Sequence, residues 1–182
     1  MRTLQTQRLR LVPVTVGNVE DLWRVLKEPH LRDFQDLPSV DVAHLRRMVE
    51  SRPRRLVPGA VGRFEWLMYG LDREPAVGWV SLRVQERDTR AAELGYSVVR
   101  DRRGRGLATE AARAMVREAF DRLEVARVRA YCVPENAASR ALLRRVGFRD
   151  DGLLRNGAMV GGQPVDVLGF VFERDDAREM LP

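Results

Sequence analysis

A cluster of arginines that contains two glycines is the part of this sequence whose residue types most clearly suggest chemistry. It reads Arg102-Arg103-Gly104-Arg105-Gly106-Leu107-Ala108-Thr109-Glu110-Ala111 and follows the apolar run from Leu94 to Val99. The first turn of a helix has unpaired backbone N–H groups and carries the positive end of the helix dipole. Glycines let a phosphate approach those donors, and the arginines add positive charge. The pattern predicts a pyrophosphate-binding loop at the start of a long helix.

Two other phosphate-binding loops fit this segment less well. A nucleoside triphosphatase loop ends in Gly-Lys-Ser/Thr, and the segment contains no lysine. A dinucleotide-binding loop has its first glycine directly after the strand and a third glycine where this chain has Thr109, whereas Arg100 to Arg103 intervene here. The structural alternative is an arginine-rich turn whose glycines serve only backbone geometry.

Length and composition are those of an ordinary globular protein. The 182 residues suit one domain, residues 1–182, and 45% hydrophobic with 32% charged residues is typical of a folded chain. We expect a cytoplasmic protein, because no signal peptide or membrane-spanning run is visible and the single cysteine, Cys132, excludes an intramolecular disulfide. His30 and His44 have no partners at ligand spacing, so no metal site is expected.

The net charge of +6 raises the question of a nucleic-acid partner. Nearly all the positive charge is arginine, with Lys27 the only lysine, and most of it is interleaved with Asp and Glu. This pattern is typical of a solvated surface. The arginines concentrate at residues 100–105, where an anionic small ligand fits as readily as nucleic acid. We therefore do not expect nucleic acid to be the partner.

Hydrophobic periodicity predicts an α/β fold. Strands are expected at residues 8–13, 64–71, 76–84, 91–99, 127–133, 149–154 and 165–173. Helices are expected at residues 18–26, 42–49 and 107–123, and after Asn136, which can cap a helix that Gly147 ends. In the helix at 107–123, Glu110 lies on the side away from the apolar stripe. The strand-helix-strand unit across residues 94–133 should be a right-handed crossover between parallel strands. A mixed sheet with helices on both faces follows.

Four motifs resemble those of the GNAT N-acetyltransferase superfamily. Arg103-x-x-Gly106-x-Ala108 looks like its acetyl-CoA pyrophosphate loop, and Ala92-Glu93-Leu94-Gly95-Tyr96 lies just upstream. Asn136-x-x-Ser139-x-x-Leu142-Leu143-x-x-x-Gly147-Phe148 is similar to the second block of the branch resembling ribosomal-protein N-terminal (alanine/serine) acetyltransferases. Leu4-x-Thr6-x-Arg8-Leu9-x-Leu11 is similar to the opening of that branch. The matches follow one another in order along nearly the whole chain.

The resemblance implies a GNAT-like mixed, mostly antiparallel sheet of six to seven strands. Its central parallel pair, here residues 91–99 and 127–133, would be splayed, with helices on both faces of the sheet. The pantetheine arm of acetyl-CoA, the expected cosubstrate, would lie in the gap and pair with the backbone of Tyr96 to Val98. An N–H near Val98 would polarise the thioester carbonyl. Asn136 would bond the pantetheine. The pyrophosphate would bind the backbone of Arg103, Gly104, Arg105, Gly106, Leu107, Ala108 and Thr109.

The resemblance also implies catalytic candidates. Glu93 is the candidate general base, and the alternative is a structural carboxylate that orients loop or arginine side chains. Ser139, expected near the sulfur, is the candidate acid for the departing thiolate; the alternative is a helix-start serine that bonds only backbone or cofactor. Tyr131 is a weaker acid candidate, since it would equally well pack in the sheet.

The chain departs from the branch at one position. Some members carry a carboxylate where this chain has Ala158; if that group serves as the base in them, this protein must use another, such as Glu93 or a water. Asp166 matches an acidic residue of the last hairpin. It is expected either to contact the acceptor amine or to form a salt bridge within the hairpin.

The expected reaction is direct transfer of acetyl from acetyl-CoA to a primary amine in a ternary complex. At neutral pH, deprotonation costs about 1 kcal/mol for an α-amine and about 4.5 kcal/mol for a lysine. An α-amine therefore tolerates a weak or water-mediated base, and we expect a protein or peptide α-amine as acceptor. The alternatives are a polyamine, aminoglycoside or amino-acid amine, or a non-catalytic acyl-CoA-binding regulatory module. The sequence leaves a homodimer open.

Overall fold

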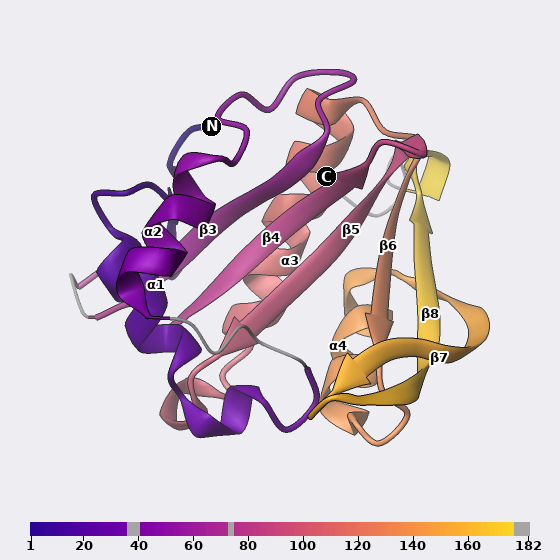
Figure 1. Cartoon of the computed structure of the whole chain (residues 1–182). Helices are drawn as coiled ribbons and strands as arrows, with labels where there is room; N and C mark the ends of the chain where they lie inside the picture. Colours follow the sequence, from indigo (N-terminus) through magenta and orange to yellow (C-terminus); the bar gives the residue numbers. More distant parts are fainter. Residues whose placement is uncertain (36–40, 73–74, 177–182) are drawn as a thin grey trace.

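One mixed sheet of eight strands organises the protein, whose computed structural model describes residues 1–35, 41–72 and 75–176 (Figure 1). Its spatial order is β1-β2-β3-β4-β5-β6-β8-β7. All neighbouring strands are antiparallel except β5 and β6, which are parallel. The strands are β1 (Leu4–Gln5), β2 (Leu9–Pro13), β3 (Gly62–Gly70), β4 (Gly78–Gln85), β5 (Asp88–Val98), β6 (Arg127–Cys132), β7 (Arg149–Val160) and β8 (Gln163–Glu173).

The predicted mixed sheet with a central parallel pair is confirmed, and its strand count is corrected to eight. The additional strand is β1, which has two residues and pairs Leu4 with Leu11 of β2. A two-residue strand is too short to show alternation in the sequence. Its position at the edge of the sheet nevertheless matters, because it leads into a segment that contacts the candidate site.

The helices cover both faces of the sheet, as predicted. Figure 1 shows α1 (Val19–Leu26) and α2 (Val42–Glu50) on the near face and α3 (Leu107–Glu118) behind the sheet. The helix α4 (Ala137–Val146) packs against α3 and β6. Ala119–Leu123 continue α3 as a π-helical turn, so the predicted helix over 107–123 changes character in its last turn. Two 3-10 turns lie at Pro29–Leu31 and Arg100–Arg102.

Alternate strand residues pack into two apolar clusters, one on each face of the sheet. The larger cluster joins Leu94 of β5 and Cys132 of β6 to α3 and α4. The smaller one joins Trp79 of β4 to α1 and α2. Because side chains alternate along a strand, Glu93 and Tyr131 project from the face that carries α1 and α2.

The parallel pair at the centre of the sheet is short. Although β5 has eleven residues, it pairs with β6 only at Ala91–Arg127, Ala92–Val128 and Glu93–Arg129. From there β5 remains paired with β4 as far as Val98, while β6 continues along β8. Figure 1 shows the two strands diverging from their common upper end. Among the described strands, none pairs with the β6 side of β5 beyond Glu93, so the expected splay is present.

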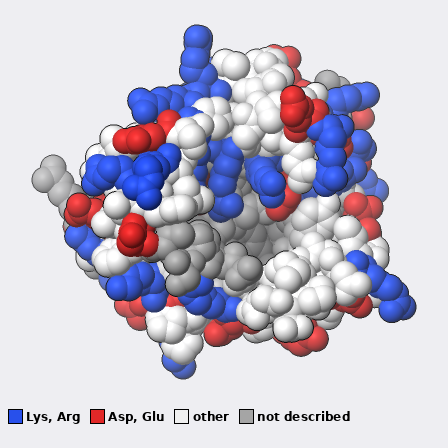
Figure 2. Space-filling view, viewed as in Figure 1, with Lys and Arg blue, Asp and Glu red and all other residues white. Residues whose placement is uncertain are grey.

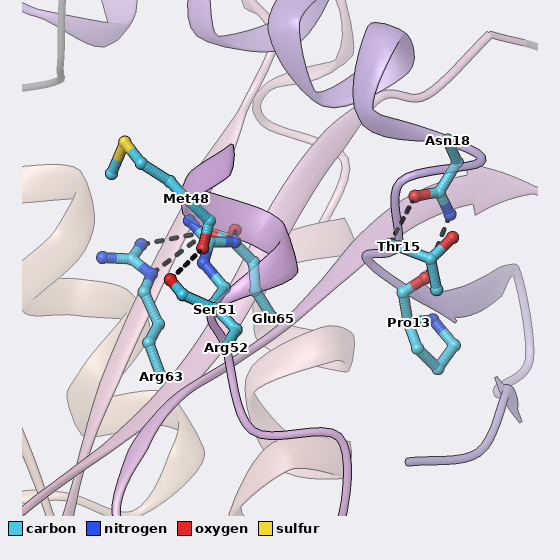
Figure 3. A network of polar contacts seen from close by, with 8 residues as sticks. All are labelled: Pro13, Thr15, Asn18, Met48, Ser51, Arg52, Arg63 and Glu65. Atoms are coloured by element: carbon cyan, nitrogen blue, oxygen red, sulfur yellow. Dashed lines mark hydrogen bonds and ion pairs between the residues drawn. The ribbon is translucent and has the colours of Figure 1, made fainter. Parts of the chain in front are cut away.

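Two polar networks fix α1 and α2 to the sheet (Figure 3). The carboxylate of Glu65, 3% exposed, pairs with Arg52 just after α2 and with Arg63, whose Nη2 lies 3.0 Å from Oε1. Asn18 accepts from the Thr15 N–H at 2.8 Å and donates to the Pro13 carbonyl at 3.0 Å. The first network joins the end of α2 to β3, and the second joins the end of β2 to the start of α1.

Replacing Gly78 with alanine should destabilise the sheet next to the splay. A Cβ at residue 78 would lie 2.1 Å from the Ser97 carbonyl oxygen and 3.0 Å from Val98 Cα. Backbone atoms of a central strand cannot move aside without disturbing their neighbours, so we expect the free energy of unfolding to fall by about 2–3 kcal/mol. Urea denaturation measures it. In the control Gly17→Ala the nearest atom is Thr15 Oγ1 at 3.6 Å, and a change below about 0.5 kcal/mol is expected. Equal effects of the two variants would contradict this packing.

Candidate active site

The arginine- and glycine-rich segment forms the loop that leads into α3. Gly104 and Gly106 have φ of +73° and +77°, a left-handed conformation that glycine adopts without strain. Gly106 is the N-cap residue of α3 and supplies no side-chain cap, and the first bond into the helix is donated by the Glu110 N–H to the Gly106 carbonyl at 3.1 Å. The N–H groups of the first turn are therefore left to a ligand or to solvent, which makes this terminus suited to an anion.

A segment far away in sequence braces this loop. The Glu110 carboxylate accepts from Thr6 Oγ1 at 2.5 Å and from both the backbone N–H and Nε of Arg8 at 2.7 Å. Arg8 Nη1 also donates to the Arg105 carbonyl at 2.7 Å. Glu110 was expected to lie on the outer side of the helix, and it does, but the N-terminal segment covers it so that only 14% of its side chain is exposed.

Arg103 joins the loop to the end of β5. Its Nε donates to the Val98 carbonyl at 3.0 Å and its Nη2 to the His30 carbonyl at 3.1 Å. Arg100 adds a contact of 2.7 Å to the imidazole Nε2 of His30. The Arg103 side chain thus has a positioning role in the protein itself. Arg105 is exposed.

The backbone of Val98 faces the divide between β5 and β6. Successive residues of a strand direct their N–H and C=O groups to opposite sides. The Val99 N–H donates to the Val77 carbonyl, on the β4 side, at 2.9 Å. Tyr96 and Val98 therefore direct their backbone groups toward the side where β6 has moved away. These N–H donors are available where the sequence predicted that the cosubstrate would pair.

Glu93 lies on the last rung of the parallel ladder, on the α1/α2 face. Its Cα neighbours across the sheet are Arg83 on β4 and Arg129 on β6. Arg129 pairs with Asp88 at 3.2 Å. Across residues 1–35, 41–72 and 75–176, the half-buried Glu93 carboxylate forms no ion pair within 4.0 Å and no hydrogen bond. A carboxylate without an internal partner is free to accept a proton or to bind an ammonium group.

Ser139 lies on the other side of the divide, in the first turn of α4. The Asn136 side chain caps this helix by accepting from the Ser139 N–H at 3.0 Å, as expected of Asn136. The Ser139 hydroxyl lies 2.8 Å from the Tyr96 hydroxyl, and either oxygen can be the donor. Burial raises the pKa of the Tyr96 hydroxyl, against a smaller lowering by Ser139, so Tyr96 stays protonated. Burial also raises the pKa of Cys132, which the Ser139 hydroxyl lowers to a lesser extent.

The other two candidates lie apart from Ser139. Tyr131 is 37% exposed and projects on the Glu93 side; burial raises its pKa, Arg129 lowers it, and the charge of Glu93 raises it. Asp166 is bound within the β7–β8 hairpin, where its Oδ1 accepts from the Asn156 N–H at 2.9 Å. Of the residues named from the sequence, the structure therefore groups Tyr96, Ser139 and Asn136 on one face of the divide and Glu93 with Tyr131 on the other.

Residues 8–149 match the model of the acetyltransferase (GNAT) domain. The chain belongs to the GNAT acetyltransferase family. It is 28% identical over 171 residues to "Uncharacterized N-acetyltransferase p20" of Bacillus licheniformis, covering 93% of this chain and 95% of that one.

Solved structures support the same assignment. RimJ of Mycobacterium smegmatis, in complex with a CoA-disulfide, is 25% identical with a TM-score of 0.75, covering 96% of this chain and 88% of that one. The ribosomal-protein-S5-alanine acetyltransferase of Vibrio fischeri has a TM-score of 0.81 over 100% of both chains at 17% identity, which is a likeness of fold.

One further feature of this GNAT acetyltransferase lies outside the site. A shallow hollow of about 560 Å³ lies between the N-terminal segment and the outer side of α3, and neither Glu93 nor Ser139 lines it. Among the described residues, no group of three or more His, Cys, Asp or Glu side chains is arranged to hold a metal ion. In the same ranges, no helix has the length and apolarity that crossing a membrane requires.

Three contributions in this acetyltransferase could not be recognised as such from the sequence. These are the pairing of the Tyr96 hydroxyl with Ser139, the bond from Arg103 to Val98, and the attachment of Glu110 to Thr6 and Arg8. All three join residues that the strand and helix patterns place in different elements. The opening motif that contains Thr6 and Arg8 was the only signal for the third.

The brace on Glu110 should make the stability of this acetyltransferase depend on pH. Burial raises the pKa of the Glu110 carboxyl. Together, the bonds from Thr6 and Arg8 lower this pKa by a larger amount, so that it lies below the ordinary 4.5. A carboxyl whose pKa is lower in the folded than in the unfolded state stabilises the fold at pH values above its unfolded-state pKa. This stabilisation is lost as the pH falls from there toward the folded-state pKa. We expect Glu110→Gln to reduce the free energy of unfolding by about 2 kcal/mol at pH 7 and by less at pH 4, where part of the contribution of the carboxylate has been lost.

The matched control for this variant is Glu50→Gln, at an exposed position on α2. Urea denaturation of the three proteins at both pH values measures the effect. A Glu110→Gln penalty that is the same at pH 7 and pH 4 would contradict the ionic origin of the brace.

Proposed function

We propose that this GNAT acetyltransferase transfers acetyl from acetyl-CoA to the α-amine of a protein or peptide. The observation that carries the proposal is the early end of the β5–β6 ladder at Glu93–Arg129. It leaves free strand backbone between an unpaired carboxylate on one face of the sheet and the Tyr96–Ser139 hydroxyl pair on the other. An acyl donor and an amine can thus meet at one point from opposite faces.

The donor side of the proposal rests on the loop before α3. The backbone N–H groups from Arg103 to Thr109 would hold the pyrophosphate, with the exposed Arg105 adding charge. The pantetheine would run along the free edge of β5 and pair with Tyr96 and Val98. Solved structures with the same fold support this, since RimJ holds a CoA-disulfide and the microcin C7 self-immunity acetyltransferase MccE holds acetyl-CoA and AMP.

The chemistry supplied by acetyl-CoA is an activated thioester. The neutral amine nitrogen attacks the carbonyl carbon and a C–N bond forms, while the oxyanion is stabilised by the N–H of Val98. Collapse of the adduct breaks the C–S bond. Glu93, directly or through a water, takes the proton lost by the amine, and Ser139 supplies a proton to the departing thiolate. The Tyr96 hydroxyl stays protonated and would orient the Ser139 hydroxyl through their 2.8 Å contact, while Ser139 would regain its proton from solvent.

The preference for an α-amine follows from the weakness of this base. An α-amine costs about 1 kcal/mol to deprotonate at neutral pH, and a lysine about 4.5 kcal/mol. One half-buried carboxylate can deprotonate an α-amine more readily than a lysine side chain. Among solved structures of the same fold are the S5-alanine acetyltransferase and RimL, a ribosomal L7/L12 α-N-protein acetyltransferase. These structural neighbours support a protein N-terminus as the acceptor.

The first experiment measures thiol release from acetyl-CoA with peptide α-amines, spermidine and an aminoglycoside. Release with the peptides is expected, and Glu93→Gln should lower kcat about 100-fold while leaving the Kd of acetyl-CoA nearly unchanged. Ser139→Ala should act in the same direction, and it retains the N–H that Asn136 binds.

Glu86→Gln, at an exposed position between β4 and β5, is the control and should be active. Bound acetyl-CoA without release for any amine would favour the binding-module alternative. Full activity of Glu93→Gln would refute the assigned base.

Gly106→Asp should damage acetyl-CoA binding. The new carboxylate would bring a negative charge to the proposed pyrophosphate site, and a Cβ there meets Arg8 Nη2 at 3.3 Å. We expect the Kd to rise at least about tenfold, or ~1.4 kcal/mol. Gly59→Asp is the matched control because Gly59 has a similar φ of +75° and no atom within 4 Å of a Cβ. Isothermal titration calorimetry decides, and unchanged affinity in Gly106→Asp would refute the loop assignment.

A further inference from the structure

Four charged side chains form a row across the central strands on the face that carries Glu93. The strand register places Arg63 of β3 opposite Arg83 of β4, Arg83 opposite Glu93 of β5, and Glu93 opposite Arg129 of β6. Figure 2, in the same view as Figure 1, shows a hollow in the middle of this face with basic side chains along its upper wall. The strand register places the three arginines beside Glu93 on the face that carries α1 and α2, from which an amine would approach it.

The arginines of this row are not equally compensated. Arg129 has its own carboxylate, Asp88, at 3.2 Å. Arg63 shares the buried Glu65 with Arg52, so that two guanidinium groups share one carboxylate and one net positive charge remains. Arg63 also lies over the Trp79 ring, 5.1 Å from its centroid, which keeps its side chain along the sheet.

Arg83 carries a second uncompensated charge. It is the exposed residue of β4, and within the described ranges it forms no ion pair within 4.0 Å. Glu93 is its cross-strand neighbour but does not come within that distance. At the proposed base, then, the Glu93 carboxylate has no partner among the described residues, and the neighbouring arginines leave two net positive charges that favour an anion.

We propose that the acceptor is an acidic N-terminus, with a carboxylate within its first three residues that binds Arg83 and Arg63. This rests on the proposed function and specifies its substrate class. The amine would lie at Glu93 and the acidic side chain over β4 and β3.

The spacing of the row fits this acceptor. Neighbouring strands lie about 4.8 Å apart, so the Cα of Arg63 is about 10 Å across the sheet from that of Glu93. An extended chain covers about 3.3–3.6 Å per residue, so its second residue lies over β4 and its third over β3 when its amine is at Glu93, and one of these two side chains faces the sheet. The same row disfavours polyamines and aminoglycosides, whose further positive charges would face the two net positive charges at Arg83 and at the Arg63–Arg52–Glu65 group.

The experiment compares acceptor peptides that differ only in charge. Peptides beginning Ser-Asp-Glu-Ala, Ser-Gln-Gln-Ala and Ser-Lys-Lys-Ala are assayed by thiol release with acetyl-CoA at 20 mM and 300 mM salt. We expect kcat/KM for the acidic peptide to exceed that for the basic one at least about tenfold at low salt, mainly through KM. The ratio should shrink at high salt, because screening weakens interactions between exposed charges.

Charge reversal separates specificity from stability. Arg83→Glu should lower the acidic-to-basic ratio by at least tenfold by raising KM for the acidic peptide and lowering it for the basic one. Its thermal midpoint and acetyl-CoA affinity should stay close to those of the wild type. Arg122→Glu, at an exposed position in the turn after α3, is the control and should keep the wild-type ratio.

The possible outcomes distinguish the two proposals. Acetylation of all three peptides at equal rates, or preference for the basic one, overturns the acidic acceptor and leaves the proposed function standing. An unchanged ratio in Arg83→Glu overturns the assignment of Arg83. No thiol release with any peptide, despite acetyl-CoA binding, overturns the proposed function and this inference with it.

Discussion

The separation of two parallel strands after Glu93 and Arg129 is the constraint on which the rest of the site depends. A ladder that continued to Val98 would bond every backbone group of β5 and close the sheet. Because β6 turns away with β8, the donors of Tyr96 and Val98 remain open. The divide also connects the two faces of a sheet that is otherwise continuous, so residues whose side chains point in opposite directions can act on the same ligand.

Contacts between distant segments hold this divide and its loop in shape. Arg103 bonds the last carbonyl of β5, and Arg8 bonds the loop carbonyl of Arg105, so both sides of the loop are tied to strands. Glu110 joins the first turn of α3 to the N-terminal segment with charge-assisted bonds, which are among the stronger kinds. The N-terminus of α3, where we propose that the pyrophosphate binds, is therefore fixed in position before any ligand arrives. Such preorganisation reduces the ordering that binding would otherwise require.

Local patterns predicted the elements of the fold well because each has a strong periodic or capping signal. The helix α4 shows both the strength and the limit of this. Asn136 and Gly147 were placed as its two ends, and the structure confirms both. Its inward face is set by Leu143 and Val146, while Ala138 and Ala141 are exposed, since alanine is as common on surfaces as in cores. The two-residue strand β1 gave no pattern at all.

Contacts between elements were beyond the reach of the sequence. Nothing in the spacing of Tyr96 and Ser139 shows that their hydroxyls meet. They come together only because α4 packs on the face of the sheet from which the Tyr96 side chain of β5 projects. The row from Arg63 to Arg129 depends on strand register. A shift of one strand by one residue would move its side chains to the other face of the sheet. The motifs suggested which residues matter, and the structure adds which face each one serves.

A crystal structure of this chain with acetyl-CoA tests the central claim most directly. The account predicts the pantetheine between β5 and β6, bonded to the backbone of Tyr96 and Val98, with the sulfur near Ser139 and the acetyl group turned toward Glu93. Acetyl-CoA bound at another place would contradict the account. A pantetheine that does not enter the gap between β5 and β6, with the thioester away from both Ser139 and Glu93, would contradict it as well.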